Sequence, residues 1–263
     1  MATCSYFLGA NTANGFYSCY DSFCPPEGGC FLWIIKGGPG CGKSTLMRKI
    51  GAAAEAAGLD VEYVLCSGDP DSLDGVYLPQ KEIAFTDGTA PHVQEPAYPG
   101  VSGAYLDLGR FYDAKALSPL RKSFVQLTAA YRAKYAEAYK ALASVLPVVT
   151  EHELPENGKR RRFRTAITCK GVVTTNPSKL CGDRDVQYLH PLLPEYPDPE
   201  DRPSVLPDCS TAIEALKAAK ALHDELEALY RPHVDFSGLD EETERILKMI
   251  FQNGCQRAKN DVE

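Results

Sequence analysis

The sequence predicts an α/β fold: a mainly parallel sheet flanked by helices, followed by a mainly helical C-terminal part. Three adjacent features lead to this prediction. An apolar run, FLWIIK, occupies residues 31–36; the glycine-rich stretch GGPGCGKS follows it directly; and helix-forming residues then continue to Gly58. A buried strand, a tight turn and a helix in this order form the unit from which parallel sheets are built.

Each element of the first part has its own signal. Residues 31–36 combine aromatic and β-branched side chains, as expected of a buried strand. The helix after the glycine-rich stretch should end at Gly58, because glycine is the usual residue just beyond a helix. Further strands are expected at residues 61–66, 76–79 and 82–86. The expected buried face of the helix consists of Leu46, Ile50, Ala53, Ala54 and Ala57.

Helical patterns dominate the rest of the chain. From Asp113 to Val145 apolar residues recur at helical spacing, and Ser118 before Pro119 suits a helix start. Thr211 and Glu214 suit a capping box for a later helix. A last helix is expected at about residues 240–251. The expected core face of the first of these helices consists of Leu120, Phe124, Leu127, Tyr131, Ala138, Leu142 and Val145.

The chain should therefore comprise an α/β domain, residues 1–150, and a second part, residues 151–263. The second part contains a basic run at residues 159–164 and a proline-rich stretch at residues 191–207, which is typical of an extended linker. The basic run is a solvated loop or, alternatively, places an arginine near a neighbouring subunit's phosphates or contacts an anionic partner.

The glycine-rich stretch matches the pattern G-x-x-x-x-G-K-[ST] of a P-loop. Glycines let several backbone N–H groups turn toward one phosphate, and the helix that follows adds the positive end of its dipole. Lys43 should reach the β- and γ-phosphates, and the Ser44 hydroxyl should bind Mg²⁺. The expected phosphate-binding residues are Gly38, Pro39, Gly40, Cys41, Gly42, Lys43, Ser44 and Thr45.

A P-loop also needs an acidic residue at the end of a neighbouring strand. Asp87 follows the apolar segment 82–86 and is expected to hold the metal with Ser44; the alternative is a turn aspartate before Gly88. His92 is expected to position or sense the γ-phosphate, although a lone histidine is also often structural. The acidic segment 69–75 is either a solvated turn or part of the nucleotide-binding edge. Because Gly88 follows Asp87, the adjacent catalytic glutamate of many ATPases is absent.

The composition of the chain limits the kinds of partner and the cellular location that we expect. The chain has 263 residues, 24% of them charged, and a formal net charge of -7, so nucleic acid is not an expected partner. The N-terminus lacks a signal-peptide pattern and no apolar run is long enough to span a membrane, so the expected location is the cytosol. The ten cysteines contain no CxxC pair and are expected to be free thiols. The alternative is a metal site that includes Cys19, Cys24 and Cys30.

One internal similarity links the two parts of the chain. FLGANTANGF at residues 7–16 resembles FRTAITCKGV at residues 163–172, with four identical positions. This match suggests that the second part began as a copy of the first. The stretch around Leu193, which would correspond to the glycine-rich loop, contains neither glycine nor lysine, so a second phosphate loop is not expected.

Together, GFYS at residues 15–18, the glycine-rich stretch, CSGDPDSLDGV at residues 66–76 and DGTAPH at residues 87–92 resemble a family of poorly characterised bacterial P-loop ATPases with two tandem domains. The resemblance resumes at residues 218–236. It implies ATP binding on an α/β nucleotide-binding fold. This chain departs from that family because most of a second nucleotide-binding domain is missing.

The function expected from the sequence is Mg²⁺-dependent ATP binding, with hydrolysis driving a conformational change. Lys43, Asp87 and His92 are the residues expected to act in the chemistry. One alternative is a nucleotide or small-molecule kinase, because GGPGCGKST also resembles kinase loops. Another is a nucleotide-dependent binding module without catalysis. A homo-oligomer is compatible with each of these functions.

Overall fold

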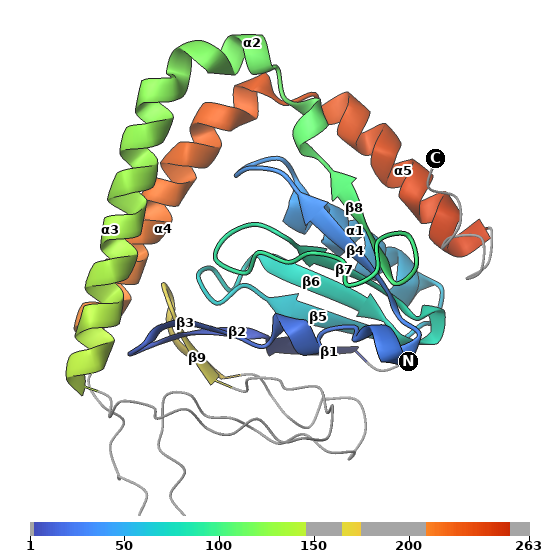
Figure 1. The fold of residues 1–263 in the computed structure, drawn as a ribbon, viewed down its shortest axis with the longest axis horizontal. Helices are drawn as coiled ribbons and strands as arrows, with labels where there is room; N and C mark the ends of the chain where they lie inside the picture. Colours follow the sequence, from blue (N-terminus) through green and yellow to red (C-terminus); the bar gives the residue numbers. More distant parts are fainter. Residues whose placement is uncertain (1–2, 146–164, 175–208, 253–263) are drawn as a thin grey trace, which may run out of the picture.

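The computed structural model describes residues 3–145, 165–174 and 209–252. Its centre is a six-stranded sheet with the strand order β1-β5-β6-β7-β4-β8 (Figure 1). All neighbouring strands are parallel except β6, which runs antiparallel to β5 and β7. The strands are β1 (Thr3–Phe7), β4 (Phe31–Lys36), β5 (Val61–Leu65), β6 (Leu73–Leu78), β7 (Ile83–Asp87) and β8 (Gly103–Asp107).

The predicted α/β class, with a mostly parallel sheet and a helical C-terminal part, is confirmed. The strand expected at residues 76–79 begins earlier, at Leu73, because Leu73 pairs with Leu65 of β5. Since β6 is antiparallel, its first residues lie at the same edge of the sheet as the last residues of β5 and β7. We call this edge the carboxyl edge.

One face of the sheet is covered by α1 (Lys43–Ala56) and α5 (Phe236–Gln252). The C-terminal helix therefore belongs to the same hydrophobic core as the first strands of the chain. Ala57 does not share the buried face predicted for α1, because the helix ends before it and the residue is exposed. The buried residues of α1 are Leu46, Met47, Ile50, Gly51 and Ala54.

Replacing Ile250 of α5 by alanine should lower the free energy of unfolding by about 2–5 kcal/mol, because it leaves a cavity in this core. Ile250 is 0% exposed and packs in the cluster that contains β4 and α1. Urea denaturation would measure the change. The exposed Lys248 on the same helix provides the control, and Lys248→Ala should change stability by less than about 0.5 kcal/mol. Equal effects of the two substitutions would contradict the assignment of α5 to the core.

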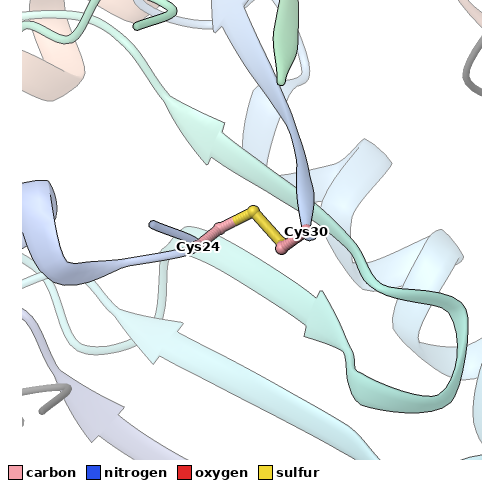
Figure 2. The surroundings of a disulfide bond; sticks show 2 residues. All are labelled: Cys24 and Cys30. Atoms are coloured by element: carbon pink, nitrogen blue, oxygen red, sulfur yellow. A yellow bond between two sulfur atoms is a disulfide. The ribbon is translucent and has the colours of Figure 1, made fainter. Parts of the chain in front are cut away.

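The other face of the sheet is covered by the hairpin of β2 (Gly9–Thr12) and β3 (Gly15–Ser18) and by the turns η1 (Tyr20–Ser22) and η2 (Pro26–Gly28). Cys24 and Cys30 form a disulfide here, with Cα atoms 5.4 Å apart (Figure 2). The expectation of free thiols is therefore wrong for these two residues. The spacing of these two cysteines in the sequence does not show that the chain reverses direction between them, before β4.

The alternative metal site with Cys19 is also not supported. Within the described ranges, no group of three or more histidine, cysteine or acidic side chains could hold a metal ion. Cys24 and Cys30 are bonded to each other, and Cys19 is buried among apolar residues on the same face.

Two long helices form an arm beside the sheet (Figure 1). The arm consists of α2 (Ala114–Leu117), η5 (Ser118–Leu120), α3 (Arg121–Val145) and α4 (Ser210–Tyr230), and α3 packs along α4. Of the α3 residues predicted to be core, Phe124 and Tyr131 contact rings of α4, and Ala138 and Leu142 pack against α4 and the hairpin of β9 (Thr165–Thr168) and β10 (Gly171–Thr174). Of the predicted set, Ala138 and Leu142 are the residues that the structure buries fully.

Both helix starts predicted for the arm are wrong. Asp113, rather than Ser118, caps the helical segment, since its carboxylate accepts hydrogen bonds from two backbone N–H groups of α2. The chain then passes through Ser118 and Pro119 as a 3₁₀ turn into α3. Helix α4 begins at Ser210 after Cys209, so Thr211 lies inside the first turn.

Two short segments, residues 109–113 and 231–235, connect the arm to the core. We call them the neck. They contain η4 (Gly109–Phe111) and η8 (Arg231–His233) and pair with each other as in an antiparallel ladder. The N–H of Asp113 donates to the carbonyl of His233 at 2.8 Å, and the N–H of Asp235 donates to the carbonyl of Phe111 at 2.9 Å. Both ends of the arm therefore leave the core at one place.

The internal sequence similarity corresponds to a shared local structure. Strands β9 (Thr165–Thr168) and β10 (Gly171–Thr174) form a hairpin like that of β2 and β3. The Thr12 hydroxyl donates to the carbonyl of Gly15 at 2.8 Å, and the Thr168 hydroxyl donates to the carbonyl of Gly171 at 3.0 Å. The two hairpins also meet, since the Asn11 side-chain amide donates to the carbonyl of Ile167.

Several predictions fall on other residues. The basic run at 159–164, the proline-rich stretch at 191–207 and the segment around Leu193 lie outside the described residues. Among the helices that are described, none combines the length and the apolar character needed to cross a membrane.

Candidate functional site

The glycine-rich loop, residues 37–44, connects β4 to α1 at the carboxyl edge, and β4 lies between β7 and β8. The predicted order of strand, loop and helix is confirmed. Gly40 and Gly42 have φ angles of 71° and 86°, a left-handed conformation that side chains disfavour. The first hydrogen bond of α1 joins the Leu46 N–H to the carbonyl of Gly42, so the N–H groups of residues 43–45 have no partner within the helix.

Lys43 folds back across this loop. Its ammonium donates hydrogen bonds to the carbonyls of Gly37 at 2.9 Å and Gly38 at 3.0 Å. A carboxylate oxygen of Asp87 lies 3.6 Å from the same nitrogen. Both side chains are largely buried, with 12% and 13% of their surfaces exposed. The loop therefore encloses a positive charge next to the end of β7.

Asp87 is a turn aspartate, which was one of the two predicted alternatives, and its carboxylate also faces the glycine-rich loop. One carboxylate oxygen accepts hydrogen bonds from the backbone N–H of Thr89 at 2.8 Å and from its hydroxyl at 2.6 Å. The other oxygen is the one near Lys43. On the neighbouring side, the Ser44 hydroxyl accepts a hydrogen bond from the backbone N–H of Leu73, at the start of β6, at 2.9 Å.

His92 lies behind Asp87, with both ring nitrogens engaged. Nδ1 is 3.0 Å from the backbone carbonyl oxygen of Asp87, and Nε2 is 3.3 Å from a carboxylate oxygen of Asp74. The Tyr20 hydroxyl donates to that same Asp74 oxygen at 3.0 Å, and its ring stacks on His92 with centroids 4.7 Å apart. This geometry suits a residue that positions Asp87. Tyr20 carried no signal in the sequence.

The buried pair of His92 and Asp74 is charged near neutral pH. Burial alone would lower the pKa of His92, but the Asp74 carboxylate and, more weakly, Asp87 together outweigh it and raise the pKa to about 9. Burial would raise the pKa of Asp74, but the charge and hydrogen bond of His92, together with hydrogen bonds from Tyr20 and Cys66, outweigh it, and the pKa is lowered overall. Burial and the nearby Asp74 raise the pKa of Tyr20 well above its usual value, so its hydroxyl remains a donor.

This pair predicts how stability depends on pH. The pKa of His92 rises from 6.5 when unfolded to about 9 in the fold, so its contribution is complete below 6.5 and is lost as the pH rises toward 9. We expect the free energy of unfolding to decrease between about pH 6.5 and about pH 9, as measured by urea denaturation.

The decrease should be smaller in His92→Gln and unchanged in His233→Gln, whose histidine lies in the neck. An equal decrease in wild-type protein and His92→Gln would show that another group causes it.

The arm and the neck close one side of the glycine-rich loop. A Cβ atom added at Gly40 would lie 3.3 Å from the backbone oxygen of Glu227 on α4. One added at Gly38 would lie 3.0 Å from the Tyr112 hydroxyl and 3.4 Å from the Tyr230 ring. The Tyr112 hydroxyl also donates to the carbonyl of Pro39 at 3.0 Å. These contacts come from residues far away in sequence, so no local pattern indicated them.

The acidic segment after β5 is tied to the second half of the chain. Lys220 of α4 lies 3.3 Å from a carboxylate oxygen of Asp69, and Lys170 of the second hairpin pairs with Asp71. The carbonyl of Gly68 accepts a hydrogen bond from the backbone N–H of Cys169 at 3.4 Å. The acidic segment is therefore not only a solvated turn, which was one of the two alternatives predicted; it also contacts α4 and the second hairpin.

The residues at the loop suit Mg²⁺ only together with a phosphate ligand. Ser44 and Asp87 could supply two oxygen ligands, and in the described part of the chain no larger set of metal-binding side chains is assembled. Mg²⁺ commonly binds in this way, with one or two protein oxygens, several waters and phosphate oxygens of the substrate. A metal held by protein side chains alone does not fit.

The fold and the site define an α/β protein with a glycine-rich strand–loop–helix element at the carboxyl edge of a mostly parallel sheet. No protein-family model, curated protein or solved structure matches the chain.

Proposed function

We propose that the protein is a P-loop nucleotide-binding protein that binds Mg²⁺-ATP at the glycine-rich loop and couples ATP binding or hydrolysis to movement of the arm. The observation that carries this proposal is the position of Lys43, whose ammonium is held by the loop's own carbonyls 3.6 Å from Asp87. A lysine enclosed by a glycine-rich turn at a helix N-terminus is suited to bind phosphate.

Each residue of the site has a role in this proposal. The N–H groups of the loop and of the first turn of α1 bind the phosphate oxygens. Lys43 exchanges its carbonyl contacts for the β- and γ-phosphates, and Ser44 and Asp87 hold the metal. Bound Mg²⁺ would neutralise charge on the phosphates. His92 and Asp74 keep the backbone of Asp87 in place.

Binding has stronger support than hydrolysis. The residue after Asp87 is Gly88, so no glutamate is available at that position to orient a water molecule. Thr89, the next side chain, already donates its hydroxyl to Asp87. Slow turnover, activation by a partner or use of an acceptor other than water are each compatible with this arrangement.

Two measurements test the function. A thermal-shift titration with ATP, ADP, GTP and CTP, with and without Mg²⁺, should show the largest stabilisation with Mg²⁺-ATP, because a ligand that binds the native state raises its apparent stability. No shift with any of these nucleotides would contradict the proposal.

Phosphate release without an acceptor would then distinguish an ATPase from the alternatives. Release well above that of Lys43→Ala supports an ATPase, and transfer that requires an added acceptor supports a kinase. Tight binding without turnover under either condition supports a binding module.

A further inference from the structure

The inner face of α4 spans two loops of the carboxyl edge. Lys220, His223 and Glu227 are three and four residues apart and therefore share one face of the helix. At one end the backbone of Glu227 packs against Gly40 of the glycine-rich loop. At the other end Lys220 pairs with Asp69, after β5, at 3.3 Å. His223 lies between these two anchor points.

His223 is half-buried between an aromatic side chain of α3 and an acidic side chain of its own helix. Its ring centroid is 5.7 Å from that of Tyr131 on α3, and Nδ1 is 3.7 Å from a carboxylate oxygen of Glu227. About a third of the side chain remains accessible, at 33%. It is thus held in place while one side remains available to a ligand.

Charged groups from two elements act on His223. Burial lowers the pKa of the imidazole; Glu227 and, more weakly, Asp224 oppose this, whereas the positive charges of Lys220 and Lys43 lower the pKa further, and the net direction is down. His223 precedes Glu227 by four residues and so shares the face of α4 on which Glu227 packs against Gly40 of the glycine-rich loop. The Lys43 ammonium lies near Asp87, at the end of β7, and the Lys220 ammonium near Asp69, after β5, so both positive charges lie at the carboxyl edge.

We propose that His223 contacts the terminal phosphate of a nucleoside triphosphate bound at the glycine-rich loop, so that α4 completes the site and distinguishes a triphosphate from a diphosphate. This inference rests on the proposed function. The ion pair of Lys220 with Asp69 keeps this part of α4 next to the carboxyl edge. A phosphate beside the imidazole favours its protonated form, because an opposite charge close by stabilises the charged state. Binding of a triphosphate should therefore take up a proton, and binding of a diphosphate should not.

Isothermal titration calorimetry tests this directly. Mg²⁺-ATP and Mg²⁺-ADP are titrated near about pH 7 in two buffers of different ionisation enthalpy, which reports the protons taken up. The wild-type protein should take up protons with ATP and not with ADP. In His223→Gln this uptake should disappear, and the ratio of ATP to ADP affinity should fall about tenfold, the size of one charge-assisted hydrogen bond.

His233→Gln is the matched control, because its histidine lines the cavity at the neck and not the inner face of α4. It should behave like the wild type.

The possible outcomes separate the two claims. An unchanged affinity ratio and unchanged proton uptake in His223→Gln would overturn the role of His223 and leave nucleotide binding intact. A wild-type protein that binds neither nucleotide would overturn the proposed function and this inference with it. Proton uptake in the wild type is informative without any variant, and its absence on ATP binding would also count against the proposal.

Discussion

Replacing Lys43 by alanine should weaken binding of Mg²⁺-ATP by about 100-fold or more, because the change removes at least one charge-assisted contact with each of two phosphates. The ammonium is already placed inside the loop, so little reorganisation is needed for it to reach them. Calorimetry or a fluorescent nucleotide analogue would measure the loss. Turnover, if the wild type has any, should fall at least as far.

Lys49 provides the control for this experiment. It lies on the same helix, but its ammonium pairs with Asp240 of α5 at 2.7 Å and is 46% exposed. Exposed ion pairs contribute about 0–1 kcal/mol, so Lys49→Ala should leave both the fold and nucleotide binding nearly unchanged. If a folded Lys43→Ala protein binds ATP as tightly as Lys49→Ala does, the glycine-rich loop is not the nucleotide site.

Replacing Asp74 by alanine should lower the free energy of unfolding by about 3–5 kcal/mol, which is the usual effect of removing one partner of a buried ion pair. Asp74 is 4% exposed and His92 is 6% exposed. Without the carboxylate, His92 loses its counter-charge and the Tyr20 hydroxyl loses its acceptor. A domain is stable by only about 5–15 kcal/mol, so this loss should be obvious in urea denaturation.

Asp240→Ala is the matched control, because it removes a carboxylate from an exposed pair and should cost less than about 1 kcal/mol. A double-mutant cycle with His92→Ala should give a coupling energy of about 1–3 kcal/mol, because the two residues are in contact. Additive effects of Asp74→Ala and His92→Ala would contradict the pairing. Asp74→Ala should also reduce nucleotide affinity, since His92 holds the backbone of Asp87.

The central part of the site was predictable because its signals are local. An apolar strand, a glycine-rich turn and a helix follow one another directly, and the conformation of each depends mainly on its own residues. Asp87 was predictable for a related reason: it is the polar residue that ends a buried strand. In the structure a carboxylate oxygen of Asp87 lies 3.6 Å from the Lys43 ammonium.

The surroundings of the site were not predictable, because they depend on residues far apart in sequence. Nothing in the sequence around His92 indicates that the Asp74 carboxylate lies beside its Nε2 atom, or that the Tyr20 ring stacks on its imidazole. The disulfide of Cys24 and Cys30 depends on the chain turning back before β4. The apolar face of α3 was recognised, but its partner was not, since a periodic pattern specifies a buried face without specifying what covers it.

The sequence by itself determined the α/β class and the strand–loop–helix element, because short-range backbone preferences decide these features. The tertiary structure alone decided that α5 joins the first core and that α4 lies against the glycine-rich loop. These depend on which apolar surfaces bury one another. A surface as far along the chain as Glu227 is from Gly40, 187 residues, is only slightly disfavoured against a nearer one, because the entropy cost of closing a loop rises by only about 0.6 kcal/mol for each doubling of its length.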